Sequence, residues 1–146
     1  MIIRQMSVFL ENRPGAMAEV LAVLKDHRVN LRALALADTS DFGILRLIVN
    51  EPDKIGCILR DAGFTVKITQ VLALTVEDDP GSLYEKLTKF SDAGVNVEYM
   101  YAFAAAGDSF ARVVLKVDNL ELAAKIANGQ ELLAESGSEE EPSFYW

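Results

Sequence analysis

The chain has 146 residues, is 51% hydrophobic and carries a formal net charge of −8. This acidic balance argues against nucleic acid binding, because a protein that binds phosphates needs clustered lysine and arginine. The apolar runs are too short to span a bilayer and no signal peptide opens the sequence, so we expect a cytoplasmic protein without a membrane partner.

The first half of the chain predicts the order strand, helix, strand, strand, helix, strand. Residues 2–10 form an apolar run, and Met17, Val20, Leu21 and Leu24 then recur with the spacing of one helical face. The remaining expected elements are strands at 30–37 and 43–49, a helix that opens at 51–53 and stops at Gly63, and a strand at 64–69.

The second half predicts the same order again. The expected elements are a strand at 71–76, a helix lined by Leu83, Leu87 and Phe90, hairpin strands at 95–103 and 110–117, and a helix lined by Leu122, Ala123 and Ile126. Residues 130–134 do not resemble the strand at 64–68, so we expect a short or misregistered last strand. The tail, residues 136–146, is acidic and then aromatic, which predicts either a solvated segment or one that docks in a groove.

The two halves are related by an internal duplication. Eight of the twenty positions in Glu11–Asn30 are identical in Glu77–Asn96, which lies 66 residues later, whereas roughly one or two would match by chance. Each copy contains Pro-Gly where a strand gives way to a helix, and Val-Asn further on. We therefore expect two domains, at 1–69 and 70–135, followed by a tail at 136–146.

The repeated order predicts an α+β fold of two tandem ferredoxin-like βαββαβ domains, each an antiparallel sheet with both helices on one face. In the strand at 43–49, Ile44 and Arg46 face opposite to Leu45 and Leu47, so both faces of the sheet are largely apolar. Because halves of this size bury little surface alone, we expect a homodimer or a larger assembly. The sheets could pack face to face, or edge strands could join into one continuous sheet.

Each Pro-Gly pair is predicted to begin a helix. Pro14 and Pro80 suit the first helical position, and the adjacent glycine allows a ligand to approach the backbone. The first helical N–H groups then point outward, where the helix dipole favours an anion such as a carboxylate. The alternative is that Pro-Gly makes only an efficient turn.

Few other residues suggest chemistry. Cys57 follows the apolar pattern of its helix and is expected to be buried, and His27 is expected to be a surface cation at a helix end. No metal ligand set is present, so we expect no metal and no cofactor. Arg46 and Arg112 are taken as equivalent positions that pair with an acidic residue such as Glu98, and without a nucleophile and base we expect no enzyme.

Two motifs resemble the ACT domain family. They are Asn-Arg-Pro-Gly-Ala-Met at 12–17 and Asp-Asp-Pro-Gly-Ser-Leu at 78–83, each followed by Val-Asn. The resemblance covers essentially the whole chain as two tandem copies. It implies a regulatory module that binds amino acids at interfaces between paired domains and is usually attached to a metabolic enzyme; here we expect a stand-alone pair.

The resemblance also implies where the ligand is bound: in the loop before each first helix and at the asparagine that opens the next strand. These residues are Asn12, Arg13, Pro14, Gly15, Ala16, Met17 and Asn30 in the first repeat, and Asp78, Pro80, Gly81, Ser82, Leu83 and Asn96 in the second. The helix-start N–H groups suit an α-carboxylate, and the side chain at position 12 or 78 can accept from an α-ammonium group. The alternative for Asn30 and Asn96 is that they only cap a turn.

The leading hypothesis is a non-catalytic sensor that binds a small amino acid and passes the signal to a partner such as a metabolic enzyme. One alternative is a detached regulatory subunit of an amino-acid biosynthetic enzyme, similar to the small subunit of acetohydroxyacid synthase. That alternative requires a stable complex with a large catalytic chain. The other is a structural adaptor, which would respond to no amino acid.

The two loops are predicted to differ. If each proline opens its helix, the N-cap residues are Arg13 and Asp79. An aspartate carboxylate occupies helix-start N–H groups, whereas arginine has no acceptor and leaves them free. We therefore expect the first loop to be the better anion site, with the charge of Arg13 beside it, and the acidic pair Asp78 and Asp79 to disfavour an anion at the second.

Overall fold

The computed structural model describes residues 1–38, 41–103 and 109–129. The chain divides into two compact units: Ile3–Val71, which we call the first unit, and Met1–Ile2 with Leu72–Trp146, which we call the second unit. The strand expected at 130–134, the hairpin turn at Gly107-Asp108 and the tail at 136–146 lie outside the described residues. None of the described helices is long and apolar enough to cross a membrane.

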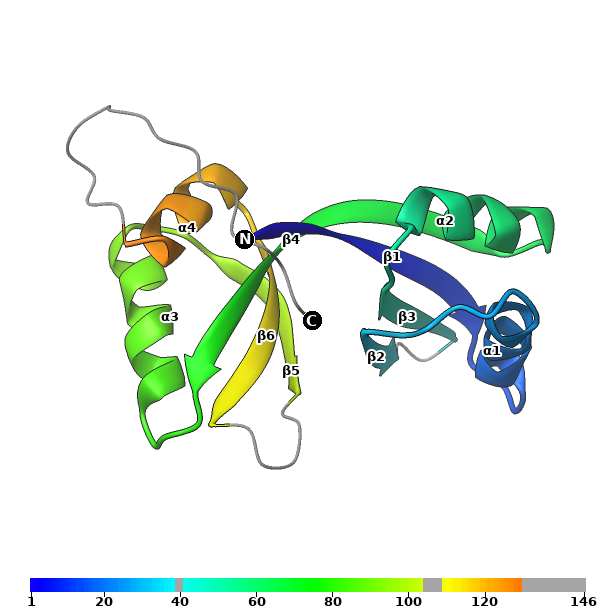
Figure 1. Ribbon diagram of the computed structural model, residues 1–146, viewed down its shortest axis with the longest axis horizontal. Coiled ribbons are helices and arrows are strands. Elements are labelled where there is room, and N and C mark those ends of the chain that lie inside the picture. The colour runs from blue at the N-terminus through cyan, green and yellow to red at the C-terminus, as the bar shows by residue number, and fades with distance from the viewer. Residues whose placement is uncertain (39–40, 104–108, 130–146) are drawn as a thin grey trace. The chain divides into compact units, whose positions relative to one another are not determined.

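The first unit has the predicted order of elements (Figure 1). They are β1 (Ile2–Glu11), α1 (Ala16–Asp26), β2 (Ala33–Asp38), β3 (Phe42–Ile48), α2 (Pro52–Asp61) and the first part of β4 (Thr65–Glu77). Its strands lie in the order β2-β3-β1-β4, and β3 is antiparallel to both β1 and β2. This is the ferredoxin-like arrangement, so the predicted fold class is confirmed.

Both helices of the first unit cover the same face of its sheet (Figure 1). Val20 and Leu24 of α1 and Leu59 of α2 are buried against Leu45 and Leu47 of β3. Each fully buried apolar side chain of this kind stabilises the fold by about 1.5–3 kcal/mol. The alternation predicted for β3 is therefore confirmed, since its odd-numbered leucines face the helices.

The described part of the second unit, which ends at residue 129, repeats the arrangement through its second helix. Its elements are the second part of β4, α3 (Ser82–Asp92), β5 (Val97–Phe103), β6 (Phe110–Val117) and α4 (Leu120–Ala127), and its strands lie in the order β4-β6-β5. Phe90 of α3 is 2% exposed and occupies the repeat position of Leu24. Leu83, predicted to share the apolar face of α3, is instead 37% exposed.

The strands expected at 64–69 and 71–76 are one continuous strand, β4, that serves both repeats. In its second part, Ala73 pairs with Val114 of β6 on one side. On its other side, Ala73 exchanges two hydrogen bonds with Met1, of 2.7 and 3.1 Å. Met1 therefore lies on the edge of β4 away from β6.

The equivalence predicted for Arg46 and Arg112 is wrong. Arg46 pairs with Ser7 in the first unit, and the residue 66 positions after Ser7 is Ala73, which pairs with Val114. The connection between β5 and β6 is longer than that between β2 and β3, which shifts the register of β6 by two residues. Val114 is thus the counterpart of Arg46.

The burial predicted for Cys57 is also wrong, because Cys57 is exposed. The buried side of α2 is marked by Ile55 and Leu59. Cys57 lies two residues beyond Ile55, which is about 200° around the helix at 3.6 residues per turn. The sequence pattern placed it near apolar residues, but the helix turns it to the opposite side.

Candidate functional site

Both Pro-Gly pairs form tight turns that precede the helices. In the first, the Ala16 N–H donates to the Arg13 carbonyl at 3.3 Å, and Gly15 has φ 85° and ψ −11°. Proline followed by a glycine of this conformation is a type II turn. Pro80 and Gly81 repeat it, with φ 92° at Gly81. The prediction that each proline is the first helical residue is therefore wrong.

The helices α1 and α3 have glycine N-caps instead of Arg13 and Asp79, and no side chain caps either helix. At such a start the N–H groups of the second and third helical residues have no acceptor within the helix. In α1 these are Met17 and Ala18. The same holds for α3, so the capping difference predicted between the loops is absent.

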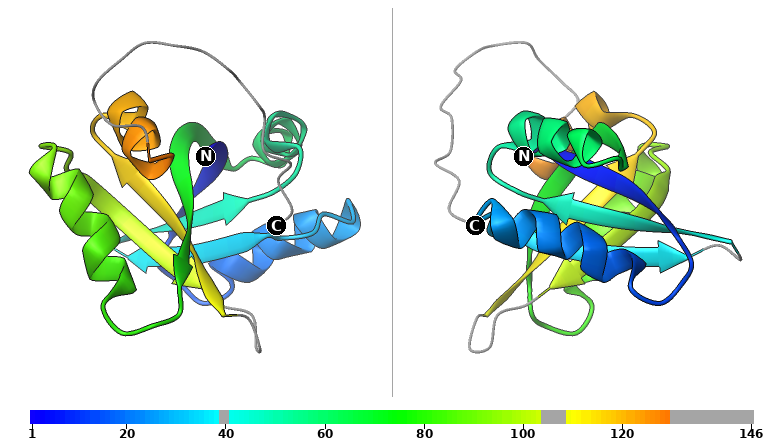
Figure 2. Two further views of the ribbon diagram at one scale, coloured as in Figure 1. Left: turned by 60° about the vertical axis from the view of Figure 1, so that its left-hand side comes forward. Right: turned by 90° about the vertical axis from the view of Figure 1, so that its right-hand side faces the viewer.

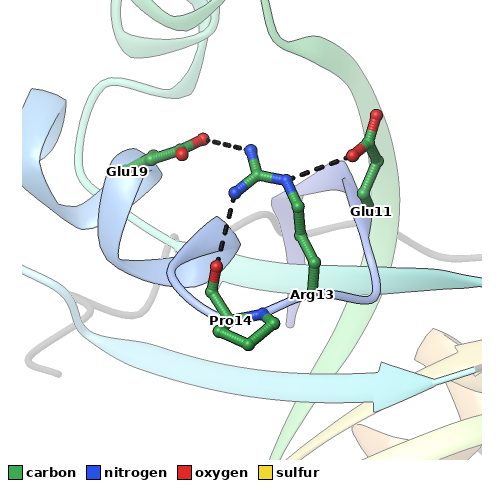
Figure 3. Close-up of polar contacts among 4 residues, drawn as sticks. All are labelled: Glu11, Arg13, Pro14 and Glu19. Atoms are coloured by element: carbon green, nitrogen blue, oxygen red, sulfur yellow. Dashed lines mark hydrogen bonds and ion pairs between the residues drawn. The ribbon is translucent and has the colours of Figure 1, made fainter.

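Arg13 is held by two carboxylates (Figure 3). Its Nε donates to Glu11 at 3.1 Å, its Nη2 to Glu19 at 2.8 Å, and its Nη1 to the Pro14 carbonyl at 3.4 Å. The hydrogen bond from Arg13 lowers the pKa of Glu19, and the bonds to Glu19 and Glu11 raise the pKa of Arg13. The positive charge expected beside the loop is present, and two carboxylates already match it.

A shallow hollow lies at each loop. The hollow of the first unit is about 340 Å³ and is lined by Glu11, Arg13, Ala16 and Glu19 together with the turn after α2. That of the second unit is about 300 Å³ and is lined by Thr75, Glu77, Ser82, Glu85, Lys86, Lys89 and Phe110. Among the residues predicted to bind the ligand, Ala16 lines the first hollow and its repeat counterpart, Ser82, lines the second.

The structure does not bring Asn30 near the loop of its own unit. Asn12 donates its N–H to the Asp41 carbonyl at 3.1 Å, just before β3, whereas Asn30 lies beside Val49 and Asn50, just after β3. Seven residues of strand separate the two points, about 23 Å at 3.3 Å per residue. The segments entering and leaving α1 accordingly lie at its two ends (Figure 2).

The predicted binding residues of the second unit are separated in the same way. The Asp78 N–H donates to Ser109 before β6, and the Asn96 carbonyl accepts from Asp118 after β6. Neither asparagine opens a strand: β2 begins at Ala33 and β5 at Val97. The predicted residues therefore form two separate groups in each unit, one at each end of the sheet.

Asn30 lines a pocket of about 260 Å³ at the end of α1. Its other polar lining residues are His27, Arg28, Asn50, Glu51 and Lys54, and its apolar lining residues are Val29, Val49, Ile55 and Ile58. Sequence reasoning missed Arg28, Asn50 and Lys54. One signal was available, since the residue at the position of Arg28 in the second repeat is a glycine.

At the same place in the second unit, polar groups of the protein bond to one another. The Asn96 N–H donates to the Asp118 carboxylate at 2.9 Å. Asn119 caps α4 by accepting from the Leu122 N–H at 3.2 Å, whereas Glu51 at the start of α2 makes no side-chain cap bond. Asn119 is thus the N-cap of α4, the helix that follows β6.

Other residues considered for chemistry have structural surroundings. Glu98, the acid expected beside Arg112, pairs with Lys116 at 3.1 Å, and Arg112 lies opposite Phe103 and Thr75. Within residues 1–38, 41–103 and 109–129, no three His, Cys, Asp or Glu side chains gather as metal ligands.

Comparison with known proteins gives one family. A model of the ACT domain pair matches residues 1–136. The crystal structure of protein BT0572 from Bacteroides thetaiotaomicron is 40% identical to the chain, with a TM-score of 0.83 and coverage of 89% of each chain. No curated protein matches the chain.

Two further crystal structures share the fold. They are regulatory subunits of aspartate kinase, from Thermus thermophilus and Thermus flavus, which are 11% and 12% identical and both have a TM-score of 0.62. Each comparison covers 89% of this chain, with 97% of the first subunit and 95% of the second. At this identity the likeness concerns the fold alone.

Proposed function

The chain belongs to the family of ACT domain pairs, and on that premise we propose that it is a non-catalytic regulatory protein that binds a small amino acid. The observation that carries the proposal is the pair of complementary half-sites in the first unit. One half offers helix-start N–H groups that no side chain caps, and the other is the polar pocket at Asn30.

The first half-site suits the α-carboxylate of an amino acid. The N–H groups of Met17 and Ala18 lie at the positive end of the α1 dipole and have no acceptor within the helix. Glu11 and Glu19 line the same hollow, so an α-ammonium group would meet carboxylates near the loop. The turn residues Pro14 and Gly15 hold this end of α1 in place.

The second half-site completes the first only when two chains pair. A two-fold axis perpendicular to α1 sets two α1 helices side by side and antiparallel. The start of one α1 then lies beside the end of the other, and Asn30 of one chain approaches residues 12–17 of its partner. The ligand is therefore proposed to bind between two copies of the first unit.

The edge of the first unit supports this pairing. β2 is the edge strand, and it carries Leu34 and Leu36, which are 47% and 53% exposed. These leucines pair with Leu47 and Leu45, so they lie on the side of the sheet that the helices cover. An unpaired strand edge beside exposed leucines is a surface that a second copy would cover. We propose a homodimer joined along β2 and α1.

The proposed regulatory role implies a separate partner, such as a metabolic enzyme in the cytoplasm. In this scheme ACT domains at 1–69 and 70–135 are followed by the tail at 136–146. Ligand binding would change the dimer surface that the partner recognises. Affinity purification from native cells would identify the partner.

The proposed function is tested first by a thermal-shift screen against the twenty amino acids. A ligand present at 100 times its dissociation constant stabilises the folded state by about 2.7 kcal/mol. Light scattering at micromolar concentration should give the mass of a dimer. A monomer, or no shift with any amino acid, would favour an adaptor without a ligand.

A matched pair of variants tests the helix-start N–H groups. Ala18→Pro removes one donor from the first turn of α1, where proline is tolerated better than in a helix interior. Tyr84→Pro makes the same change at the repeat position in α3. We expect Ala18→Pro to weaken ligand binding by about tenfold, the loss of one hydrogen bond to a charged group, and Tyr84→Pro to leave it unchanged.

A further inference from the structure

The end of α1 adopts a backbone conformation that is otherwise given to glycine. Among the described residues, Arg28 is the one non-glycine residue with a positive φ, of 55°. The residues at the same point after the other three helices are Gly63, Gly94 and Gly129. Each of the four donates its N–H to the carbonyl three residues earlier, as in the Schellman arrangement that closes a helix.

Glycine takes this left-handed conformation without strain, and arginine does not. Gly94 is the repeat counterpart of Arg28, so one copy keeps glycine and the other carries a strained residue. A Cβ built on Gly94 would meet no atom within 4 Å, so crowding does not decide which residue is present. A strained residue at a pocket suggests that its side chain has a role.

The walls of the pocket supply mainly hydrogen-bond donors. Arg28 and Lys54 contribute a guanidinium and an ammonium group, and Asn30 and Asn50 contribute amides. The Oδ1 of Asn50 accepts from the Arg32 Nε at 3.0 Å, which leaves the NH₂ group of Asn50 as a donor. This set of groups is suited to an anion.

The pocket is also positive within an acidic chain. Its one carboxylate, Glu51, lies 3.8 Å from the Lys54 ammonium, so Arg28 and Lys54 against Glu51 leave one positive charge. No described carboxylate lies within ion-pair distance of Arg28. A volume of about 260 Å³ admits a small group.

We infer that the amino acid bound by the first unit is acidic, aspartate or glutamate, and that Arg28 and Lys54 bind its side-chain carboxylate. The inference rests on the proposed function, in which the α-carboxylate is bound at the partner's helix start. A guanidinium binds a carboxylate through two parallel hydrogen bonds. Asparagine and glutamine have similar shapes but carry no charge to match the pocket.

Isothermal titration of the full chain with aspartate, glutamate, asparagine and glutamine tests this inference. We expect the acidic amino acid to bind at least about tenfold more tightly than its amide analogue. Arg28→Gly should reduce that ratio to about one, and Lys54→Gln should reduce it in part. Lys25→Gln removes an exposed cation of α1 that does not line the pocket, so it should leave the ratio unchanged.

The outcomes separate the two proposals. Binding of a neutral amino acid, with no preference for acid over amide, would overturn the inference and keep the proposed function. Binding of none of the twenty amino acids would overturn both. An equal loss of preference in Arg28→Gly and Lys25→Gln would mean that overall charge, and not the pocket, selects the ligand, which also overturns the inference.

Discussion

The two repeats agree where each first helix begins and differ where it ends. Both helices begin after a type II turn with a glycine N-cap. At the far end, the first repeat has Arg28 beside an open pocket, whereas the second has Gly94 and ties Asn96 to Asp118. A duplicated backbone can therefore carry different polar contacts at the same place in its two copies.

The largest expected effect comes from the core residues at the same repeat position. Leu24→Ala and Phe90→Ala each create a cavity at a side chain that is 2% exposed, and should destabilise the protein by about 2–5 and 3–5 kcal/mol. Only Leu24→Ala should also weaken amino acid binding, because α1 leads to the pocket. Denaturant unfolding measures the loss of stability, and calorimetry on the folded variants measures amino acid binding. An equal loss of binding in the two variants would contradict a site in the first unit alone.

The Pro-Gly turns should respond equally in stability and unequally in binding. Alanine at Gly15 or Gly81 has room for its Cβ, so the expected cost of about 1–2 kcal/mol is that of the left-handed backbone. Gly15→Ala should weaken amino acid binding and Gly81→Ala should not. If Gly81→Ala alone affected binding, the ligand site would belong to the second unit.

The residues that follow α1 and α3, Arg28 and Gly94, can each be replaced by the other. Arg28→Gly should stabilise the protein by about 1 kcal/mol through relief of strain, and Gly94→Arg should destabilise it by a similar amount. Thermal unfolding of both variants measures this. Gly94→Arg should not create a second ligand site, because Asp118 still holds Asn96. A less stable Arg28→Gly would show that Arg28 is required by packing.

The second helices of the two units should also differ at their starts. Asn119→Ala removes the bond to the Leu122 N–H and should cost about 1 kcal/mol. Glu51→Ala removes a residue that makes no cap bond and should change stability by less than about 0.5 kcal/mol. Equal losses would mean that Glu51 stabilises α2 in another way.

The smallest expected effect concerns Arg13, whose place in the second repeat is taken by Asp79. Because Arg13 lowers the pKa of Glu19, this pair stabilises the folded state above the ordinary carboxyl pKa, and the contribution is lost as the pH falls through the lowered value. Arg13→Gln should raise the pKa of Glu19 and flatten the acid side of the stability curve. An NMR titration of Glu19 that is unchanged would contradict this.

The order of elements could be predicted because apolar periodicity and turn residues are local signals. The helix starts could not, since Pro14 is compatible with the first helical position and with a type II turn, and the glycine conformation that decides between them is not visible in the sequence. The strand register of the second hairpin could not be predicted for a similar reason. A longer hairpin displaced Arg112 from the place of Arg46 without changing any local pattern.

The candidate site was predicted only in part. Asn30 and the loop at 12–17 were singled out, but their separation by the length of β3 depends on the fold. Arg28 was missed because its left-handed backbone conformation is visible only in the structure. The alignment of the repeats did carry a signal, since Arg28 stands where the second repeat has a glycine.

We propose that the first unit alone carries the amino acid site, and the ligand stoichiometry shows whether it does. Isothermal titration of the dimer with the preferred acidic amino acid should give one site per chain, and Arg28→Gly should remove the preference for the acid over its amide. Two equal sites per chain, or one site that responds to Gly81→Ala and not to Gly15→Ala, would contradict the claim.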